Sequence, residues 1–200
     1  GVTKDDLKWS PDGKRLAFRG YEETDFARIY DVYIVTFEKD FTNLSVSKLG
    51  IQSPSYIERV EGVAWSPDGK RIAYAMRTSI HILNIEENKY EKNFTLPTEK
   101  GIYVHEGFEW NGKYFVFSNG DDLFLMDLDG NITPLTRGIP DEKQGWLRHF
   151  VYPDWLDEKR IVFEYSLSYE SGLIGLIDIE KGKITMLVQE GKNRAPSCAP

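Results

Sequence analysis

The chain has 200 residues, of which 40% are hydrophobic and 14% aromatic, so it can bury one sizeable core and is not a disordered segment. Its 25 Lys and Arg against 32 Asp and Glu give a net charge of -7, which argues against nucleic acid as a partner because phosphates are repelled. The longest nearly apolar run, around 172–177, is far too short to span a bilayer, so we expect no membrane span. The single cysteine, Cys198, cannot form an internal disulfide and is compatible with more than one compartment.

A motif that begins with tryptophan recurs along the chain. The ten residues Trp9–Phe18 (WSPDGKRLAF) return almost unchanged at Trp65–Tyr74 (WSPDGKRIAY), and shorter copies begin at Trp110 and Trp155. The intervals between these tryptophans are 56, 45 and 45 positions. The first interval is longer because it contains the segment 21–28, which is acidic and aperiodic and is predicted to be an inserted loop on one rim.

Each copy of the motif belongs to a unit of four predicted strands. A short strand leads into the tryptophan, and Ser-Pro-Asp-Gly then predicts a turn, since Pro restricts φ, Asp can bond nearby backbone and Gly accepts a positive φ. An alternating second strand follows, as at 15–19 and 159–164. Third strands are predicted at 31–36, 79–84, 122–127 and 174–178, and fourth strands include 131–136 and 183–188. Short polar turns join these strands, so each unit is an antiparallel meander.

Four-stranded units that repeat every forty-odd residues predict an all-β chain, a β-propeller of four-stranded antiparallel blades. A Greek-key sandwich would not repeat its motif, and the recurring tryptophan can fill the wedge between neighbouring blades. The predicted bounds are about 1–50, 57–97, 102–137 and 147–189, with the start of a further blade at 194–200. Because Cys198 stands at the next tryptophan position, we expect these four blades to be part of a larger propeller. Open blade edges also predict self-association.

The motif at Trp9–Phe18 and Trp65–Tyr74 resembles the repeat of TolB-like, WD40-like propellers, and the copies at Trp110 and Trp155 depart from it by lacking Ser-Pro. The same repeat is found in the propellers of prolyl-oligopeptidase-family serine peptidases, including acylaminoacyl-peptidase-like members. The resemblance implies that a peptidase's catalytic Ser, Asp and His would lie in a separate hydrolase domain, with the serine in a Gly-x-Ser-x-Gly elbow. No such elbow occurs in this sequence, so the resemblance implies a scaffold and not an activity.

Charged residues and histidines precede the tryptophans at similar spacings. If strand alternation turns them toward a central channel, they could hold a peptide terminus or a cation. The candidate binding residues are Arg59, Glu61, His105, Glu106, Arg148 and His149. The simpler interpretation, which we favour, is mutual ion pairing around a solvated channel.

The sequence predicts no catalytic residue, no metal site and no cofactor. Asp127, Asp129 and Asn131 superficially match a calcium loop, but the downstream bidentate glutamate is absent, so a hairpin turn is the better interpretation. His81 alternates with apolar neighbours and is predicted to be a surface or packed histidine. The leading hypothesis is a non-catalytic scaffold that binds a protein or peptide. The alternative is the substrate-gating propeller of a serine peptidase whose hydrolase domain is not in this chain.

Overall fold

A computed structural model describes residues 7–25, 28–38, 43–51, 59–137, 149–168, 171–188 and 196. The predicted site residue Arg148, the cysteine Cys198 and, apart from Pro196, the predicted start of a further blade lie outside the described residues.

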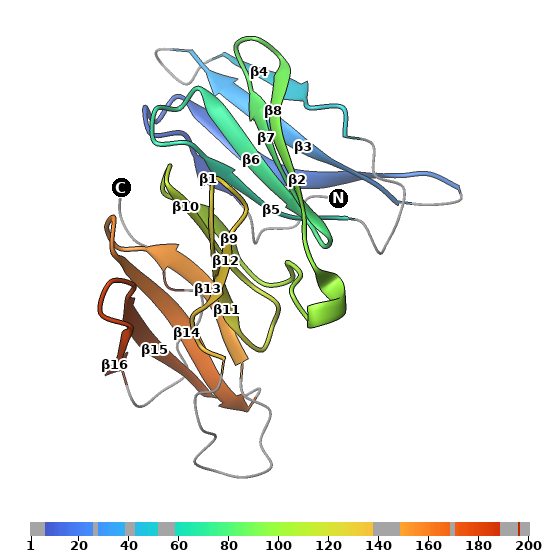
Figure 1. The fold of residues 1–200 in the computed structure, drawn as a ribbon. Helices are drawn as coiled ribbons and strands as arrows, with labels where there is room; N and C mark the ends of the chain where they lie inside the picture. Colours follow the sequence, from blue (N-terminus) through green and yellow to red (C-terminus); the bar gives the residue numbers. More distant parts are fainter. Residues whose placement is uncertain are drawn as a thin grey trace. The chain divides into compact units, whose positions relative to one another are not determined.

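The described residues form four separate four-stranded sheets, each an antiparallel meander (Figure 1). The first sheet holds β1 (Lys8–Trp9), β2 (Arg15–Glu23), β3 (Arg28–Phe37) and β4 (Leu44–Lys48). The second holds β5 (Val60–Trp65), β6 (Arg71–Met76), β7 (Ser79–Asn84) and β8 (Lys89–Thr95). The third holds β9 (Phe108–Trp110), β10 (Tyr114–Ser118), β11 (Leu123–Asp127) and β12 (Ile132–Pro134). The fourth holds β13 (His149–Trp155), β14 (Arg160–Ser168), β15 (Ser171–Asp178) and β16 (Lys183–Val188).

The only helical element in the described part of the chain is the short 3-10 turn η1 (Thr98–Lys100). The predicted all-β class and the four-stranded antiparallel blades are therefore confirmed. The chain divides into two compact units, residues 1–98 with the first two sheets and residues 99–200 with the other two.

The predicted turn after the tryptophan is confirmed in both full copies of the motif. In the second copy, the Gly69 N–H donates to the Ser66 carbonyl at 2.8 Å, and Gly69 has a φ of +68°. The Ser66 hydroxyl accepts from the Arg71 N–H at 3.0 Å, and Asp68 accepts from the Lys70 N–H at 3.0 Å. Ser10, Asp12 and Gly13 make the same set of bonds in the first copy. The identical sequence therefore produces an identical turn.

The shorter copies reach the same reversal with one Asx side chain in place of Ser-Pro-Asp. The Asn111 carbonyl oxygen Oδ1 accepts from the N–H groups of Lys113 and Tyr114 at 3.0 and 2.8 Å. Asp157 accepts in the same way from Lys159 and Arg160 at 2.9 and 2.8 Å. Asn and Asp can bond the backbone two or three residues ahead, which is why the turn survives the loss of Ser-Pro.

The segment 21–28 is not the aperiodic loop that its composition predicts. Tyr21 pairs with Tyr30 and Glu23 with Arg28, so β2 and β3 continue in register past the rest of their sheet. Figure 1 shows this hairpin projecting from the first sheet. Cross-strand contacts support it, since the Tyr21 and Tyr30 rings lie 5.6 Å apart and the Arg28 guanidinium lies 4.8 Å from the Tyr21 ring.

Of the two tryptophans of the repeated motif in the first unit, Trp65 fills the space between the sheets, whereas Trp9 is 53% exposed and packs on Phe37 of its own sheet. The Trp65 indole donates to the Lys8 carbonyl at 2.9 Å, and the Arg15 guanidinium lies 4.8 Å over its ring. Trp65 is buried in a core that combines both sheets and includes Ala17, Ile34 and Val63. Because burial of such a large ring is favourable, this contact stabilises the packing of the two sheets.

In the second unit, a glycine makes room for a core phenylalanine. Gly175 on β15 lies opposite Phe163 on β14, and a Cβ atom on Gly175 would lie 2.2 Å from the Phe163 ring. Phe163 is fully buried and packs on Phe150, with their ring centroids 5.7 Å apart, so the ring cannot move aside freely.

We expect Gly175→Ala to destabilise the second unit by about 2 kcal/mol, because it overpacks this core. Urea unfolding measures the change. Phe163→Leu combined with Gly175→Ala is expected to recover part of the loss. If the double variant loses as much as the two single variants together, the clash is not the cause.

His81 is packed against a tyrosine, which agrees with the second of its two predicted environments, surface or packed. Its ring stacks on Tyr74 with centroids 4.7 Å apart, and its Nε2 lies 2.8 Å from the Ser79 hydroxyl. Burial lowers the pKa of His81 below its usual value of 6.5.

This shift predicts a pH dependence of stability. Below about pH 6.5 the unfolded chain takes up a proton at His81 more readily than the folded chain does, so stability falls as the pH falls through this range. Urea unfolding at about pH 7.5 and 5.5 should show a smaller loss for His81→Phe, which keeps a ring on Tyr74 but cannot titrate. An equal loss in both proteins would contradict this assignment.

Candidate functional site

In the first unit, the predicted site residue Glu61 forms an ion pair that links the two sheets. The Glu61 carboxylate accepts from the Arg59 Nε at 3.1 Å and lies 3.6 Å from the Arg19 Nη1. The Glu61 side chain is only 2% exposed, and the Arg19 guanidinium also donates to the carbonyls of Val60 and Glu61 at 3.3 Å. Arg19 belongs to β2 and Glu61 to β5, so this ion pair links two sheets, while Arg59 stays 27% exposed.

In the second unit, the other described candidates gather around Gly120. His149 Nδ1 lies 3.1 Å from the Gly120 carbonyl and 3.9 Å from the Asp121 carboxylate. His105 approaches the same glycine, since a Cβ there would lie 3.7 Å from its Cδ2 atom, and His105 Nε2 lies 3.9 Å from Glu106 Oε1. The side chains of His105 and Glu106 are each 36% exposed and that of His149 is 26% exposed.

A buried polar network holds the turn under this cluster. Ser118, fully buried, donates its hydroxyl to the Phe150 carbonyl at 2.7 Å and accepts from the Gly120 N–H at 2.8 Å. Asn119 accepts from the N–H groups of Asp121 and Asp122 at 3.0 and 2.8 Å. These satisfied buried bonds hold a tight turn and fix the Gly120 carbonyl that faces His149.

Backbone strain next to the cluster was not visible in the sequence. Tyr152 has a φ of +50°, which is unusual for a residue with a side chain, and its N–H donates to the Glu106 carbonyl at 3.2 Å. Gly107 has a φ of +95° and lies against β13, where a Cβ atom on Gly107 would be 2.6 Å from Pro153 Cδ. The signal that could have pointed here is the Tyr-Pro pair, because Pro in an inner strand marks a bulge.

The simple alternation used to place the candidates on one side is wrong in detail. The register shifts between Val60 and Gly62 in β5 and between Val151 and Asp154 in β13. His105 lies before β9 and not within it, and its N–H donates to the Ser118 carbonyl at 2.8 Å. A bulge adds one residue to a strand and so changes which side the following residues face.

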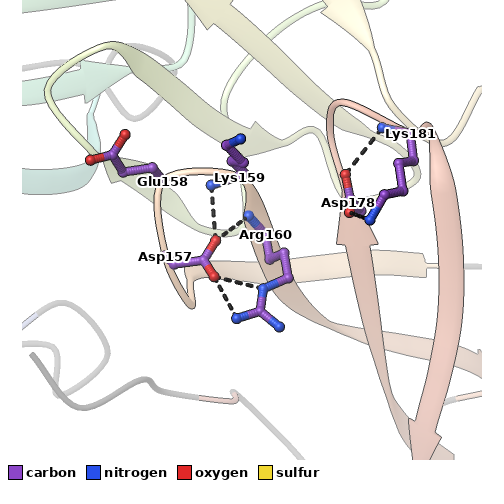
Figure 2. Close-up of a pocket in the computed structure, with 6 residues that line it drawn as sticks. All are labelled: Asp157, Glu158, Lys159, Arg160, Asp178 and Lys181. Atoms are coloured by element: carbon purple, nitrogen blue, oxygen red, sulfur yellow. Dashed lines mark hydrogen bonds and ion pairs between the residues drawn. The ribbon is translucent and has the colours of Figure 1, made fainter.

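An open depression on the fourth sheet lies at the end opposite His149, and Figure 2 shows the charged residues that line it. Glu158 and Lys159 pair with Lys113 and Glu180, which lie outside the lining. Arg160 lies on Asp157, and Lys181 lies 2.9 Å from Asp178. The Arg160 hydrogen bond lowers the pKa of Asp157, and the Lys181 bond lowers that of Asp178. Because neighbours already neutralise these charges, the depression offers little to a ligand.

The loop at Asp127 is a hairpin turn, as predicted. Asp127 accepts from the Asp129 and Asn131 N–H groups at 2.9 and 2.8 Å, and the Asn131 side chain donates to it at 2.8 Å. These bonds, led by the Asn131 side chain, lower the pKa of Asp127. Among the described residues, no group of three or more His, Cys, Asp or Glu side chains could hold a metal ion.

No family model and no curated protein sequence matches this chain. Solved structures do match it. Puromycin hydrolase is 13% identical with a TM-score of 0.62, and the match covers 94% of this chain and 29% of the hydrolase. The RRP9 WD40 repeats are 14% identical with a TM-score of 0.57, covering 94% of this chain and 51% of theirs. A putative dipeptidyl aminopeptidase IV from Bacteroides ovatus is 15% identical with a TM-score of 0.52, covering 90% and 32%.

These likenesses and the four sheets define a WD40-like β-propeller fold, which confirms the predicted class. The chain is a propeller-type scaffold. It spans about half the length of the RRP9 WD40 chain, and less than a third of the length of puromycin hydrolase and of the dipeptidyl aminopeptidase IV-like protein. No helix in the described part of the chain is long and apolar enough to cross a membrane.

Proposed function

We propose that this propeller binds a protein or peptide segment that carries a positive charge, through the side chains around Gly120. His105, Glu106 and His149 form the contact surface in the second unit. Arg148 stays a prediction from the sequence, because it lies outside the described residues. The predicted residues Arg59 and Glu61 belong to the first unit, where they pair with each other, and they are not part of this contact surface. The observation that carries this proposal is that His105 and His149 both approach Gly120. The distance from His149 Nδ1 to the Gly120 carbonyl oxygen is 3.1 Å.

The electrostatics favour a cation over an anion. Glu106 is 36% exposed and Asp121 is 65% exposed, so the cluster offers two accessible carboxylates to a ligand. The chain as a whole carries a charge of -7. A rigid turn below the cluster reduces the entropy lost on binding.

The test uses fluorescent hexapeptide libraries rich in lysine, labelled at the C-terminus, with either a free or an acetylated N-terminus. We expect saturable binding in anisotropy titrations, weakened about tenfold or more by Glu106→Gln combined with His149→Asn. Glu158→Gln is the matched control, because it removes an exposed carboxylate at the opposite end of the fourth sheet. No binding to wild type, or equal weakening by the control, would refute the proposal.

A second candidate function is substrate gating in a serine peptidase. It is favoured by the match to puromycin hydrolase and to the dipeptidyl aminopeptidase IV-like protein, of whose chains 29% and 32% are covered. A Gly-x-Ser-x-Gly elbow followed by Asp and His elsewhere in the same open reading frame would support it. A reading frame that encodes only further blades would support the binding scaffold.

A further inference from the structure

Strand β4 is an open edge of the first sheet in the part of the chain that the structure describes. All five of its residues are exposed, and Leu44 and Val46 are 59% and 57% exposed. Beyond the two ends of β4, Glu38 donates to the Asn43 carbonyl at 3.1 Å and Leu49 donates to the Val32 carbonyl at 3.0 Å.

Hydrogen-bonded pairs alternate along an antiparallel ladder, and the β3–β4 register is continuous. Ser45 and Ser47 therefore direct their backbone groups toward β3, as Asn43 and Leu49 do. The N–H and C=O groups of Leu44, Val46 and Lys48 point away from the sheet. This outward set is centred on Val46.

The outer strands of the other three sheets are protected against strand addition, and β4 is not. β8 carries the charges of Lys89, Glu91 and Lys92 and a register shift, and β12 has only three residues, the last of them Pro134. β16 has a register shift against β15. Charges, proline, bulges and short length are the usual means by which proteins block edge pairing. β4 reads Leu-Ser-Val-Ser-Lys with a charge only at its last residue.

We propose that β4 pairs with β4 of a second copy of this chain, antiparallel and about a two-fold axis at Val46. This register places Val46 opposite Val46 of the partner subunit and Leu44 opposite Lys48 of the partner subunit. Every outward N–H then meets an outward carbonyl, because the outward set is symmetric about its centre. The inference does not depend on the proposed peptide site.

Side chains and charges fit the same arrangement. Leu44, Val46 and Lys48 share one side of the strand, so the apolar pairs of the two copies lie together. The Lys48 ammonium is paired with Glu22 of its own copy and lies 5.4 Å from the Tyr33 ring. Its charge is thus partly neutralised, and it faces a leucine and not another lysine. A single pair of strands buries little area, so the dimer is expected to be weak and reversible.

Sedimentation velocity of the full chain tests the pairing. The weight-average mass should rise from 23.1 kDa toward twice that value with increasing concentration. Val46→Lys places two like charges face to face at the axis and should raise the dissociation constant about tenfold or more. Leu187→Lys is the control, because it adds the same charge to another outer strand at a residue that is 53% exposed.

Hydrogen exchange locates the contact. The N–H groups of Leu44, Val46 and Lys48 should exchange rapidly in dilute protein and become protected as the dimer forms, while Val46→Lys abolishes that change. A mass that stays monomeric at high concentration overturns the proposal. It is also overturned if Val46→Lys and Leu187→Lys weaken association equally, or if these three amides gain no protection.

Discussion

Glu61→Ala is expected to destabilise the first unit by about 3–5 kcal/mol, because it removes the carboxylate that two arginines hold in a buried position. The Glu61 side chain is 2% exposed and that of Arg19 is 16% exposed, so water cannot replace the lost partner easily. The loss should appear in urea unfolding followed by tryptophan fluorescence, since the indole of Trp65 lies between the same two sheets.

The control for this prediction is Glu23→Ala. Glu23 is 68% exposed and pairs with Arg28 at 3.3 Å, near the tip of the projecting hairpin. We expect no measurable loss there, because solvent screens exposed pairs. A Glu61 variant as stable as the Glu23 variant would show that the buried pair does not hold the sheets together.

Gly107→Ala is expected to destabilise the second unit by about 2–4 kcal/mol, from unfavourable positive φ and from overpacking. Gly107 has a φ of +95°, and a Cβ would lie 2.6 Å from Pro153 Cδ and 3.0 Å from Tyr152 Cα. These neighbours are a proline ring and backbone, which yield little. Because His149 lies on the same strand as Tyr152, the variant should also weaken binding at the proposed site.

Gly182→Ala separates the two causes in this prediction. Gly182 has a φ of +62°, and a Cβ there would meet no atom within 4 Å, so this variant reports the cost of a left-handed φ without a clash, about 1 kcal/mol. The difference between the two variants in urea unfolding measures the clash together with the less favourable φ of Gly107. Equal losses would mean that β13 moves aside at no cost.

Much of the fold could be predicted from local sequence because its units are local. The strands predicted at 79–84 and 183–188 match β7 and β16, and Ser-Pro-Asp-Gly folds in the same way twice. The hairpin at 21–28 was missed because Glu22 and Glu23 interrupt the apolar alternation. They lie on a projecting part of the sheet that has no core to face.

The candidate site was predicted less well, for a physical reason. Spacing from the tryptophans selected Glu61 and Glu106 as equivalent, yet one is buried between two arginines and the other is 36% exposed. Two bulges and the positive φ of Tyr152 change the side of the sheet to which nearby side chains point. Bulges and positive φ values leave no strong signal in a single sequence.

The sequence by itself determined the repeat, the four-stranded meander and the turn after each tryptophan. The turns and strands depend on residues close to one another in sequence, and the repeat shows the same local pattern several times. Only the tertiary structure decided that Arg19 neutralises Glu61, that His105 and His149 meet at Gly120, and that β4 alone lacks edge protection among the outer strands described. These features join residues 15 to 42 positions apart or depend on strand register, and packing between strands sets both.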